Sequence, residues 1–185
     1  MVGRSRQIEQ IVIRDADIPG IMSLIRHAEK LGTQFIKPEL IRSIKGKTEK
    51  ETFYNLWKML RSGITYIPDG EIQRVQSPGA LWKSGQGDCK SFAVFVASVL
   101  QKMCLPYELV LDRYEASRPN HGHIYVRSNG VIIDPVNPVF NRQDSVWRRK
   151  TYRGIDYCST VGSRPAKPAG AGMFLLILLI ALVYE

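Results

Sequence analysis

One stretch, residues 85–103, constrains the fold of this chain more than any other. It opens with the turn-forming residues Gly85, Gly87 and Asp88 and continues from Cys89 into apolar positions with helical spacing. These positions are Phe92, Phe95, Val96, Val99, Leu100 and Met103. Because the Asp88 carboxylate can accept hydrogen bonds from first-turn amides, we predict an N-capped helix that starts at Cys89 and packs against the core.

Cys89 lies on the packed face of this helix, because steps of three and four residues from it reach Phe92 and Ala93. The thiol therefore points inward. The helix dipole and the first-turn amides would stabilise a thiolate there, and the same amides could hold an oxyanion. Free cysteine usually packs as a small apolar side chain, so Cys89 taken alone favours an inert residue.

A second stretch predicts a β-hairpin. Residues 121–127 and 131–135 are rich in β-branched and aromatic residues and flank Asn129-Gly130, a strong signal for a two-residue type I′ turn. The turn fixes three pairs: Arg127 with Ile132, Val126 with Ile133, and Tyr125 with Asp134. His123 then becomes the diagonal neighbour of Asp134 on one face, about 7–8 Å away by backbone, which an imidazole and a carboxylate can bridge.

The remaining elements follow from periodicity and from turn residues. We expect a strand over 8–13, helices over 17–31, 38–45 and 48–63, a strand over 64–67, a polar segment over 71–77, a helical turn over 78–82 and a strand over 107–111. Thr48 and Glu51 form a capping box for the third helix. Residues 141–168 lack periodicity and are expected to form a basic linker.

Length and charge limit the class of protein. A chain of 185 residues suits one domain with an appendage. The formal net charge is +9, and residues 136–168 hold seven Lys or Arg against two Asp. This excess predicts an anionic neighbour, either a membrane surface or nucleic acid. Nucleic acid is the weaker alternative, because the chain has no zinc-finger spacing and no basic motif interleaved with aromatic residues.

The cysteines indicate the compartment. Cys89, Cys104 and Cys158 are odd in number and lack framework spacing, which argues against a disulfide-stapled secreted domain and favours a reducing, cytoplasmic compartment. The polar N-terminus offers no signal-peptide core.

The C-terminal run 169–184 has no charged residue. As a helix it would span roughly 24 Å, somewhat less than a hydrocarbon core of roughly 30 Å. Either it docks on the domain or it enters a membrane. Because it is apolar all round, we expect insertion, with Arg164 and Lys167 at the near interface and Tyr184 at the far one.

A nucleophilic cysteine needs a base and a group that orients the base. Cys89, His123 and Asp134 supply these in order, on a helix start, a strand and a neighbouring strand. Here the chain resembles the transglutaminase-like superfamily of papain-type cysteine enzymes. The matching blocks are 87–93, 123–126 and 133–135, and the resemblance extends over residues 48–135.

The resemblance implies an α+β fold whose nucleophile helix packs on an antiparallel sheet. It implies that Cys89 is the nucleophile, His123 the base and later the acid, and Asp134 the orienting residue. The chemistry would be attack on an amide carbonyl of a protein or peptide, with a thioester intermediate. Water as the second substrate makes a peptidase or amidase, an amine makes a cross-linker, and no cofactor is expected.

Three points stay open at this level. The oxyanion could be held by the Cys89 amide, with Gln86 and Gln76 as candidate side-chain donors. His121 is a rival base on the same strand face. A zinc site built on Cys89, His121 and His123 lacks a fourth ligand with paired spacing, so we expect no metal.

The chain is thus expected to divide into four parts. These are an N-terminal strand with helices (1–47), a transglutaminase-like core (48–140), a basic linker (141–168) and a membrane-inserted tail (169–184). The expected function is a membrane-tethered cysteine hydrolase or acyltransferase. The alternative is a structural or assembly protein that reuses the fold, such as a membrane-associated phage virion protein, because the family has small phage-borne members.

Overall fold

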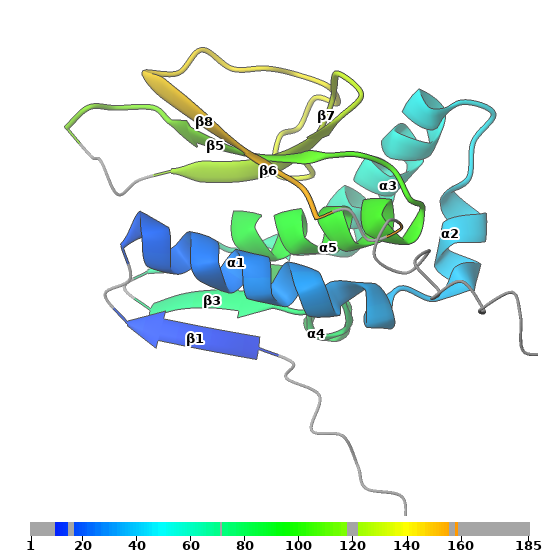
Figure 1. Ribbon diagram of the computed structural model, residues 1–185, viewed down its shortest axis with the longest axis horizontal. Helices are drawn as coiled ribbons and strands as arrows, with labels where there is room; N and C mark the ends of the chain where they lie inside the picture. The colour runs from blue at the N-terminus through cyan, green and yellow to red at the C-terminus, as the bar shows by residue number, and fades with distance from the viewer. Residues whose placement is uncertain (1–9, 15–16, 71, 118–121, 156–157, 159–185) are drawn as a thin grey trace, which may run out of the picture.

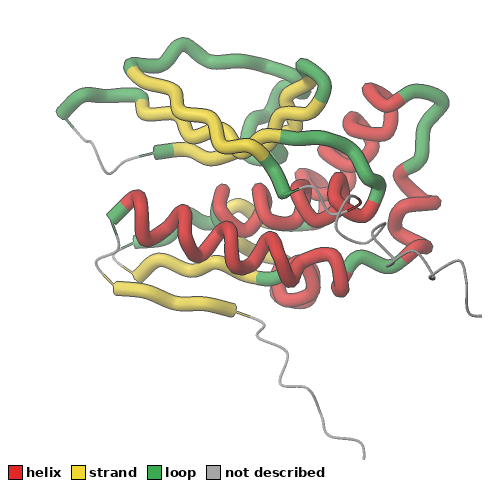
Figure 2. The backbone as a smooth tube through the Cα atoms, viewed as in Figure 1, coloured by secondary structure: helices red, strands yellow, loops and turns green. Residues whose placement is uncertain are grey.

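The computed structural model describes residues 10–14, 17–70, 72–117, 122–155 and 158. The fold is α+β. Helix α5 (Cys89–Lys102) occupies the middle, with a four-stranded sheet on one side and helix α1 (Ile18–Gly32) on the other (Figures 1 and 2).

The four-stranded sheet is antiparallel. It consists of β5 (Glu108–Arg113), β6 (His123–Ser128), β7 (Val131–Ile133) and β8 (Arg148–Arg153), in the order β7-β6-β5-β8. The hairpin register is confirmed, since Val126 pairs with Ile133 and Arg127 with Ile132. One face packs on α5 through Leu109, Leu111, Ile124, Val126 and Ile133. The other face carries a small separate cluster of Val110, Tyr125 and Ile132.

Two smaller sheets complete the strands. β1 (Gln10–Arg14) pairs antiparallel with β3 (Ile72–Gln76), and β2 (Thr65–Tyr66) pairs parallel with β4 (Gln86–Gly87). Helix α4 (Pro78–Ser84) joins β3 to β4. The second pairing matters for function, because it attaches β2 directly to the turn before Cys89.

The remaining helices begin where their caps predict. Asp17 accepts a hydrogen bond from the amide of Gly20 at the start of α1, and Thr48 accepts one from Glu51 at the start of α3 (Glu49–Gly63). Between them lie a 3₁₀ turn, η1 (Thr33–Phe35), and α2 (Pro38–Ile44). At Gly32 α1 approaches α5 so closely that a Cβ would overlap the side chain of Ser98, so this position requires glycine.

Helix α5 is buried along its length rather than on one face. All of its residues from Cys89 to Gln101 are buried, including the polar Lys90, Ser91 and Ser98. An apolar ladder identifies one packed face, but the uncharged run 91–101 is the signature of a helix surrounded by protein.

Three strand assignments need correction. β3 lies within the segment expected to be merely polar, and β8 lies within the expected linker 141–168. Both strands, IQRVQ and RRKTYR, are rich in charged and polar residues and lack an apolar residue at every second position, which is the usual signal of a strand. Expected strand 64–67 shortens to β2, because only Thr65 and Tyr66 pair with β4.

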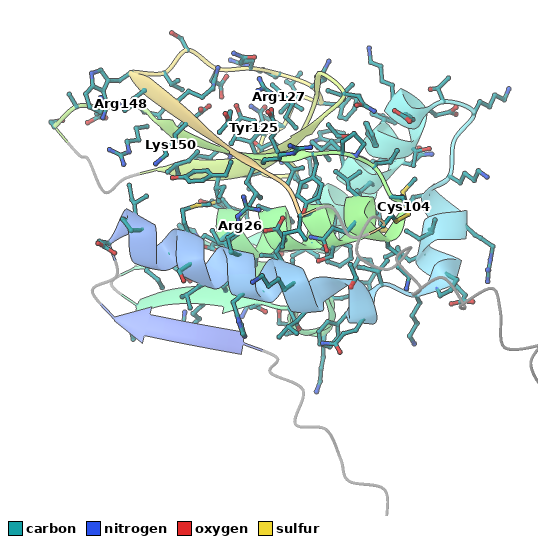
Figure 3. All side chains as sticks on the ribbon, viewed as in Figure 1. Arg26, Cys104, Tyr125, Arg127, Arg148 and Lys150 are labelled. Carbon is teal, nitrogen blue, oxygen red and sulfur yellow. A yellow bond between two sulfur atoms is a disulfide. The ribbon has the colours of Figure 1, made fainter. Side chains whose placement is uncertain are left out.

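Cys104 and Cys158 form a disulfide that closes the C-terminal end of α5 onto the chain after β8, opposite the end that carries Cys89 (Figure 3). The sequence had argued against disulfide stapling, because an odd number of cysteines shows no pairing. One pair and one free thiol account for that number. Cys89 is the free cysteine.

No helix within the described ranges has the length and apolar composition to cross a membrane. The run 169–184, with its expected insertion, lies outside those ranges.

Candidate active site

Cys89 is the first residue of α5, and the preceding turn holds it in place. Asp88 accepts a hydrogen bond from the amide of Ser91 (3.2 Å), so the predicted N-cap is confirmed. The amide of Ile67, which follows β2, donates to the carbonyl of Gly87 (2.9 Å). Because the first helical residue has no intrahelical acceptor for its N–H, Cys89 offers a thiol and an amide donor at one point.

His123 and Asp134 meet at the open end of the hairpin. Nε2 of His123 lies 2.7 Å from Oδ2 of Asp134. The other carboxylate oxygen accepts from the amide of Val136 (3.1 Å), and the carbonyl of Asp134 accepts from Nε1 of Trp57 on α3 (2.9 Å). Asp134 is therefore fixed through both its side chain and its backbone, which in turn fixes the imidazole.

The same imidazole interacts with Cys89, the candidate nucleophile. Burial would lower the pKa of His123, but hydrogen bonds to Asp134 and to Cys89 outweigh burial and raise the pKa to about 10. The ring is therefore protonated at neutral pH. Because Nε2 is committed to Asp134, Nδ1 is the nitrogen left to face the thiol. The structure thus pairs His123 with Asp134, and Cys89 contributes to the raised pKa of His123, while the catalytic roles of the three residues stay a prediction.

A pocket of about 370 Å³ opens over His123 and Asp134. Two tyrosines line it, Tyr66 on β2 and Tyr114 just beyond β5. Burial, followed by the charges of Cys89 and Asp88, raises the pKa of Tyr66 to about 12. Burial and the charge of Asp112 raise the pKa of Tyr114 to about 12. Both hydroxyls keep their protons at neutral pH and can donate hydrogen bonds.

A buried network supports His123 from behind. Tyr125 stacks against the imidazole, with ring centroids 5.8 Å apart, and its hydroxyl donates to Asp112 (3.1 Å). Nε and Nη2 of Arg149 on β8 donate to the two carboxylate oxygens of Asp112 at 2.6 and 2.7 Å. Tyr125 lies on the sheet face that points away from α5 (Figure 3). The edge strand is thus linked to the ring of the candidate base.

Lys90 adds a fixed positive charge beside Cys89, the candidate nucleophile. Its Nζ contacts Asp88 and lies 3.4 Å from Oδ2 of Asp69. Burial opposes the charge, but Asp88 and Cys89 raise the pKa of Lys90. A buried lysine in this setting stays protonated and compensates the two carboxylates that surround it.

The two glutamines considered as oxyanion donors lie elsewhere. Nε2 of Gln76 donates to the carbonyl of Gln86 (3.0 Å), and Oε1 of Gln76 accepts from Ser84 (3.0 Å). Both glutamines line a separate pocket of about 290 Å³. The structure does not bring them into the pocket over His123. Their role as oxyanion donors stays a prediction.

Two further expectations concern metal and the rival base. His121 lies outside the described residues. Within the described residues, no three side chains of His, Cys, Asp or Glu group in a way that could hold a metal ion.

Sequence reasoning missed Tyr66, Tyr114 and the Tyr125–Asp112–Arg149 network. Tyr66 enters the site through the parallel pairing of β2 with β4, which joins residues about twenty positions apart. The hairpin register did place Tyr125 beside His123, so its proximity could have been found from the sequence. Arg149 could not, because its strand was not recognised.

No family model matches the chain, and no curated protein matches its sequence. Among solved structures, the chain is similar to a candidate cysteine protease from Cytophaga hutchinsonii, with 12% identity and a TM-score of 0.39. The match covers 77% of this chain and 60% of the other. Similarity at this level establishes neither the family nor the activity of the chain.

Proposed function

We propose that this protein is a cysteine-dependent hydrolase or acyltransferase that acts on amide bonds of a protein or peptide. The observation that carries the proposal is the position of His123, whose ring bonds to Asp134 at 2.7 Å and whose pKa is raised by Asp134 and by Cys89. A buried cysteine that only fills space needs no imidazole with a fixed orientation beside it.

The reaction begins with the thiolate of Cys89, which the neighbouring imidazolium of His123 stabilises. The sulfur attacks the amide carbonyl, a C–S bond forms, and the carbonyl oxygen takes the electron pair. His123 then gives its proton to the departing nitrogen as the C–N bond breaks. Water or an amine then attacks the thioester carbon, the C–S bond breaks and returns the Cys89 thiolate, and His123 takes up the proton that this second nucleophile releases.

Two donors suit the oxyanion. The amide of Cys89 is one, because the helix leaves it without an acceptor. Tyr66 is the other, since its hydroxyl is protonated and lines the pocket that contains His123. Gln76 and Gln86 remain candidates only if the turn rearranges, since the Gln76 amide already bonds to the Gln86 carbonyl.

The proposal is tested by the reactivity of the free thiol. We expect iodoacetamide to alkylate Cys89 rapidly at neutral pH and His123→Ala to slow that reaction by about tenfold or more, because the imidazolium that favours the thiolate is gone. Intact-mass spectrometry follows the rate. His27→Ala, an exposed histidine on α1, is the matched control and should leave the rate unchanged.

If labelling of Cys89 is as slow as for an ordinary thiol, or if His123→Ala has no effect, the catalytic proposal fails. A structural or assembly role for the fold then becomes the better account.

We further propose that the apolar run 169–184 tethers the domain to a membrane. The support is its uncharged sequence and the cations Arg164 and Lys167 just before it.

The Cys104–Cys158 disulfide counts against the reducing compartment that the cysteine number favoured, because disulfides persist in oxidising compartments.

Deletion of residues 173–185 should move the protein from the membrane fraction to the supernatant on ultracentrifugation. A full-length protein that is already monodisperse without detergent would contradict the tether.

A further inference from the structure

A second pocket reaches the nucleophile from the other side. Its volume is about 60 Å³, and Cys89 forms part of its wall. The other walls are mainly aliphatic, from Ile18, Ile21, Met22 and Ile25 on α1 and from Leu111 and Ile124 on the sheet, and Gln73 and Lys90 add two polar side chains. The thiol therefore borders the small pocket, whereas the larger pocket with its two tyrosines borders His123 and Asp134.

Helix α1 provides this wall because the first part of its apolar stripe packs against the core without being fully buried. Ile25 and Ala28 are buried in the core, and Gly32 lies against α5. Ile18 and Ile21, one turn or more earlier, are only partly buried. An aliphatic surface next to a nucleophile that the fold leaves partly open is suited to an apolar group of a ligand.

The two pockets meet at Gly122, which lines both. A Cβ at this position would lie 2.9 Å from Cδ1 of Leu111 and 3.3 Å from the carbonyl oxygen of Asp112. The space beside the sheet at this point thus suits a residue without a side chain. One extended substrate could pass over Gly122, with its reacting carbonyl at Cys89.

The position of His123 gives this path a direction. Among the described residues, His123 lines the large pocket but not the small one. The group that protonates the departing nitrogen must lie on the side of that nitrogen. The leaving amine therefore belongs in the large pocket, and the acyl part of the substrate belongs in the small one.

We propose that the small pocket between α1 and Cys89 binds the side chain of the acyl group, and that it selects a small aliphatic side chain between methyl and isopropyl in size. This rests on the proposed function, because it assigns the acyl side of that reaction. A volume of about 60 Å³ is under half of the about 150 Å³ of an apolar cavity that binds benzene, so the pocket favours a small aliphatic side chain over an aromatic one.

The test uses a series of N-acetyl-aminoacyl chloromethyl ketones with glycyl, alanyl, valyl, leucyl and phenylalanyl side chains. The thiolate displaces chloride, so that a C–S bond forms as the C–Cl bond breaks, and no amide needs to be cleaved. Intact-mass spectrometry of the full chain gives the rate of labelling at Cys89. We expect the alanyl and valyl reagents to react about tenfold or more faster than the glycyl and phenylalanyl reagents.

Two variants of α1 locate the selection. Ile21→Ala enlarges the small pocket and should raise the rate with the leucyl and phenylalanyl reagents by about tenfold, while the alanyl reagent changes little. Leu24→Ala is the matched control, because Leu24 is also a partly buried aliphatic residue of α1 but does not line the pocket. It should keep the wild-type order of rates.

The outcomes separate this inference from the proposed function. Rates that do not depend on side-chain size, equal effects of Ile21→Ala and Leu24→Ala, or no labelling by any reagent would each overturn the pocket assignment. Size-dependent labelling by a protein that cleaves no N-acetyl-aminoacyl anilide would support the pocket assignment and contradict the proposed hydrolase activity. Cleavage of those anilides without a size preference would support the proposed hydrolase activity and contradict the pocket assignment.

Discussion

Two tyrosine hydroxyls line the pocket over His123, and they differ in what surrounds them. After burial, the charge of Cys89 raises the pKa of Tyr66 most, whereas the pKa of Tyr114 is raised most by the charge of Asp112 and least by that of Cys89. Tyr66 is therefore the tyrosine of this pocket whose pKa Cys89 affects more. Tyr114 serves as a natural comparison in the same pocket.

We expect Tyr66→Phe to lower kcat for an N-acetyl-alanyl anilide by about 100-fold with little change in KM, because one donor to the oxyanion is lost. Tyr114→Phe should change kcat by no more than a few-fold. Steady-state kinetics with both variants provide the measurement. Equal losses of kcat in the two variants would contradict the role of Tyr66 as an oxyanion donor. Tyr66 would then be only one of the residues that line the pocket.

At this scale the sequence identified the residues whose geometry is local. Asp88 caps the helix of Cys89 three residues away, and the Asn129-Gly130 turn sets the register of His123 and Asp134. Tyr66 was out of reach, because its place depends on a parallel pairing between short strands. Gln76 and Gln86 show the converse. A glutamine amide can donate to an oxyanion and both residues lie near Cys89 in the sequence, but the side-chain amide of Gln76 already donates to the carbonyl of Gln86.

Strand β8 was not predicted from the sequence, yet it contributes a residue to the network behind His123. It is an edge strand, paired on one side with β5, and it delivers Arg149 to the carboxylate of Asp112. Asp112 is 1% exposed. A carboxylate so deeply buried depends on its guanidinium partner, so the edge strand contributes to stability as well as to the support of His123.

Arg149→Met should lower the free energy of unfolding by about 3 kcal/mol, because it leaves Asp112 buried without its charge partner. Arg148→Met, on the exposed neighbouring position of the same strand, should change it by less than about 0.5 kcal/mol. Urea denaturation followed by circular dichroism measures both. A loss in Arg149→Met no larger than in Arg148→Met would mean that Asp112 does not need the arginine.

Strand prediction succeeded where apolar residues alternate and failed where charged ones do. The β6–β7 hairpin carries its turn signal and its buried residues in one short segment. β8, with the sequence RRKTYR, has no such pattern, and its pairing with β5 is decided by Asp112 and by backbone hydrogen bonds. The segment 141–168 was therefore interpreted as a linker.

For the whole molecule, the disulfide and the candidate site lie at opposite ends of the same central helix. The Cys104–Cys158 bond joins residues 54 positions apart and ties the C-terminal end of α5 to the chain beyond β8. The α+β arrangement followed from the sequence, but this link did not, because the number of cysteines cannot reveal which two are neighbours in space. The contribution of α1 to the small pocket was hidden as well, because the sequence does not show which elements are neighbours in space.

Cys158→Ser should lower the free energy of unfolding by about 4 kcal/mol, the loop-closure entropy expected for a loop of this length. Reduction of the wild type with dithiothreitol should have the same effect, and the variant should no longer respond to the reductant. Urea titrations with and without dithiothreitol make the comparison. Wild-type stability that is insensitive to the reductant would show that the bond does not form in solution.

The hydrogen bond from the indole of Trp57 to the Asp134 carbonyl gives the molecule an intrinsic optical reporter. Trp57 also lies 3.3 Å from the carbonyl oxygen of Asn137, which lines the pocket, whereas Trp82 and Trp147 are 51% and 50% exposed. An aqueous quencher such as acrylamide therefore reaches those two first and leaves the emission of Trp57. If filling the pocket moves the segment after β7, the remaining fluorescence of Trp57 should change, so that no attached dye is needed.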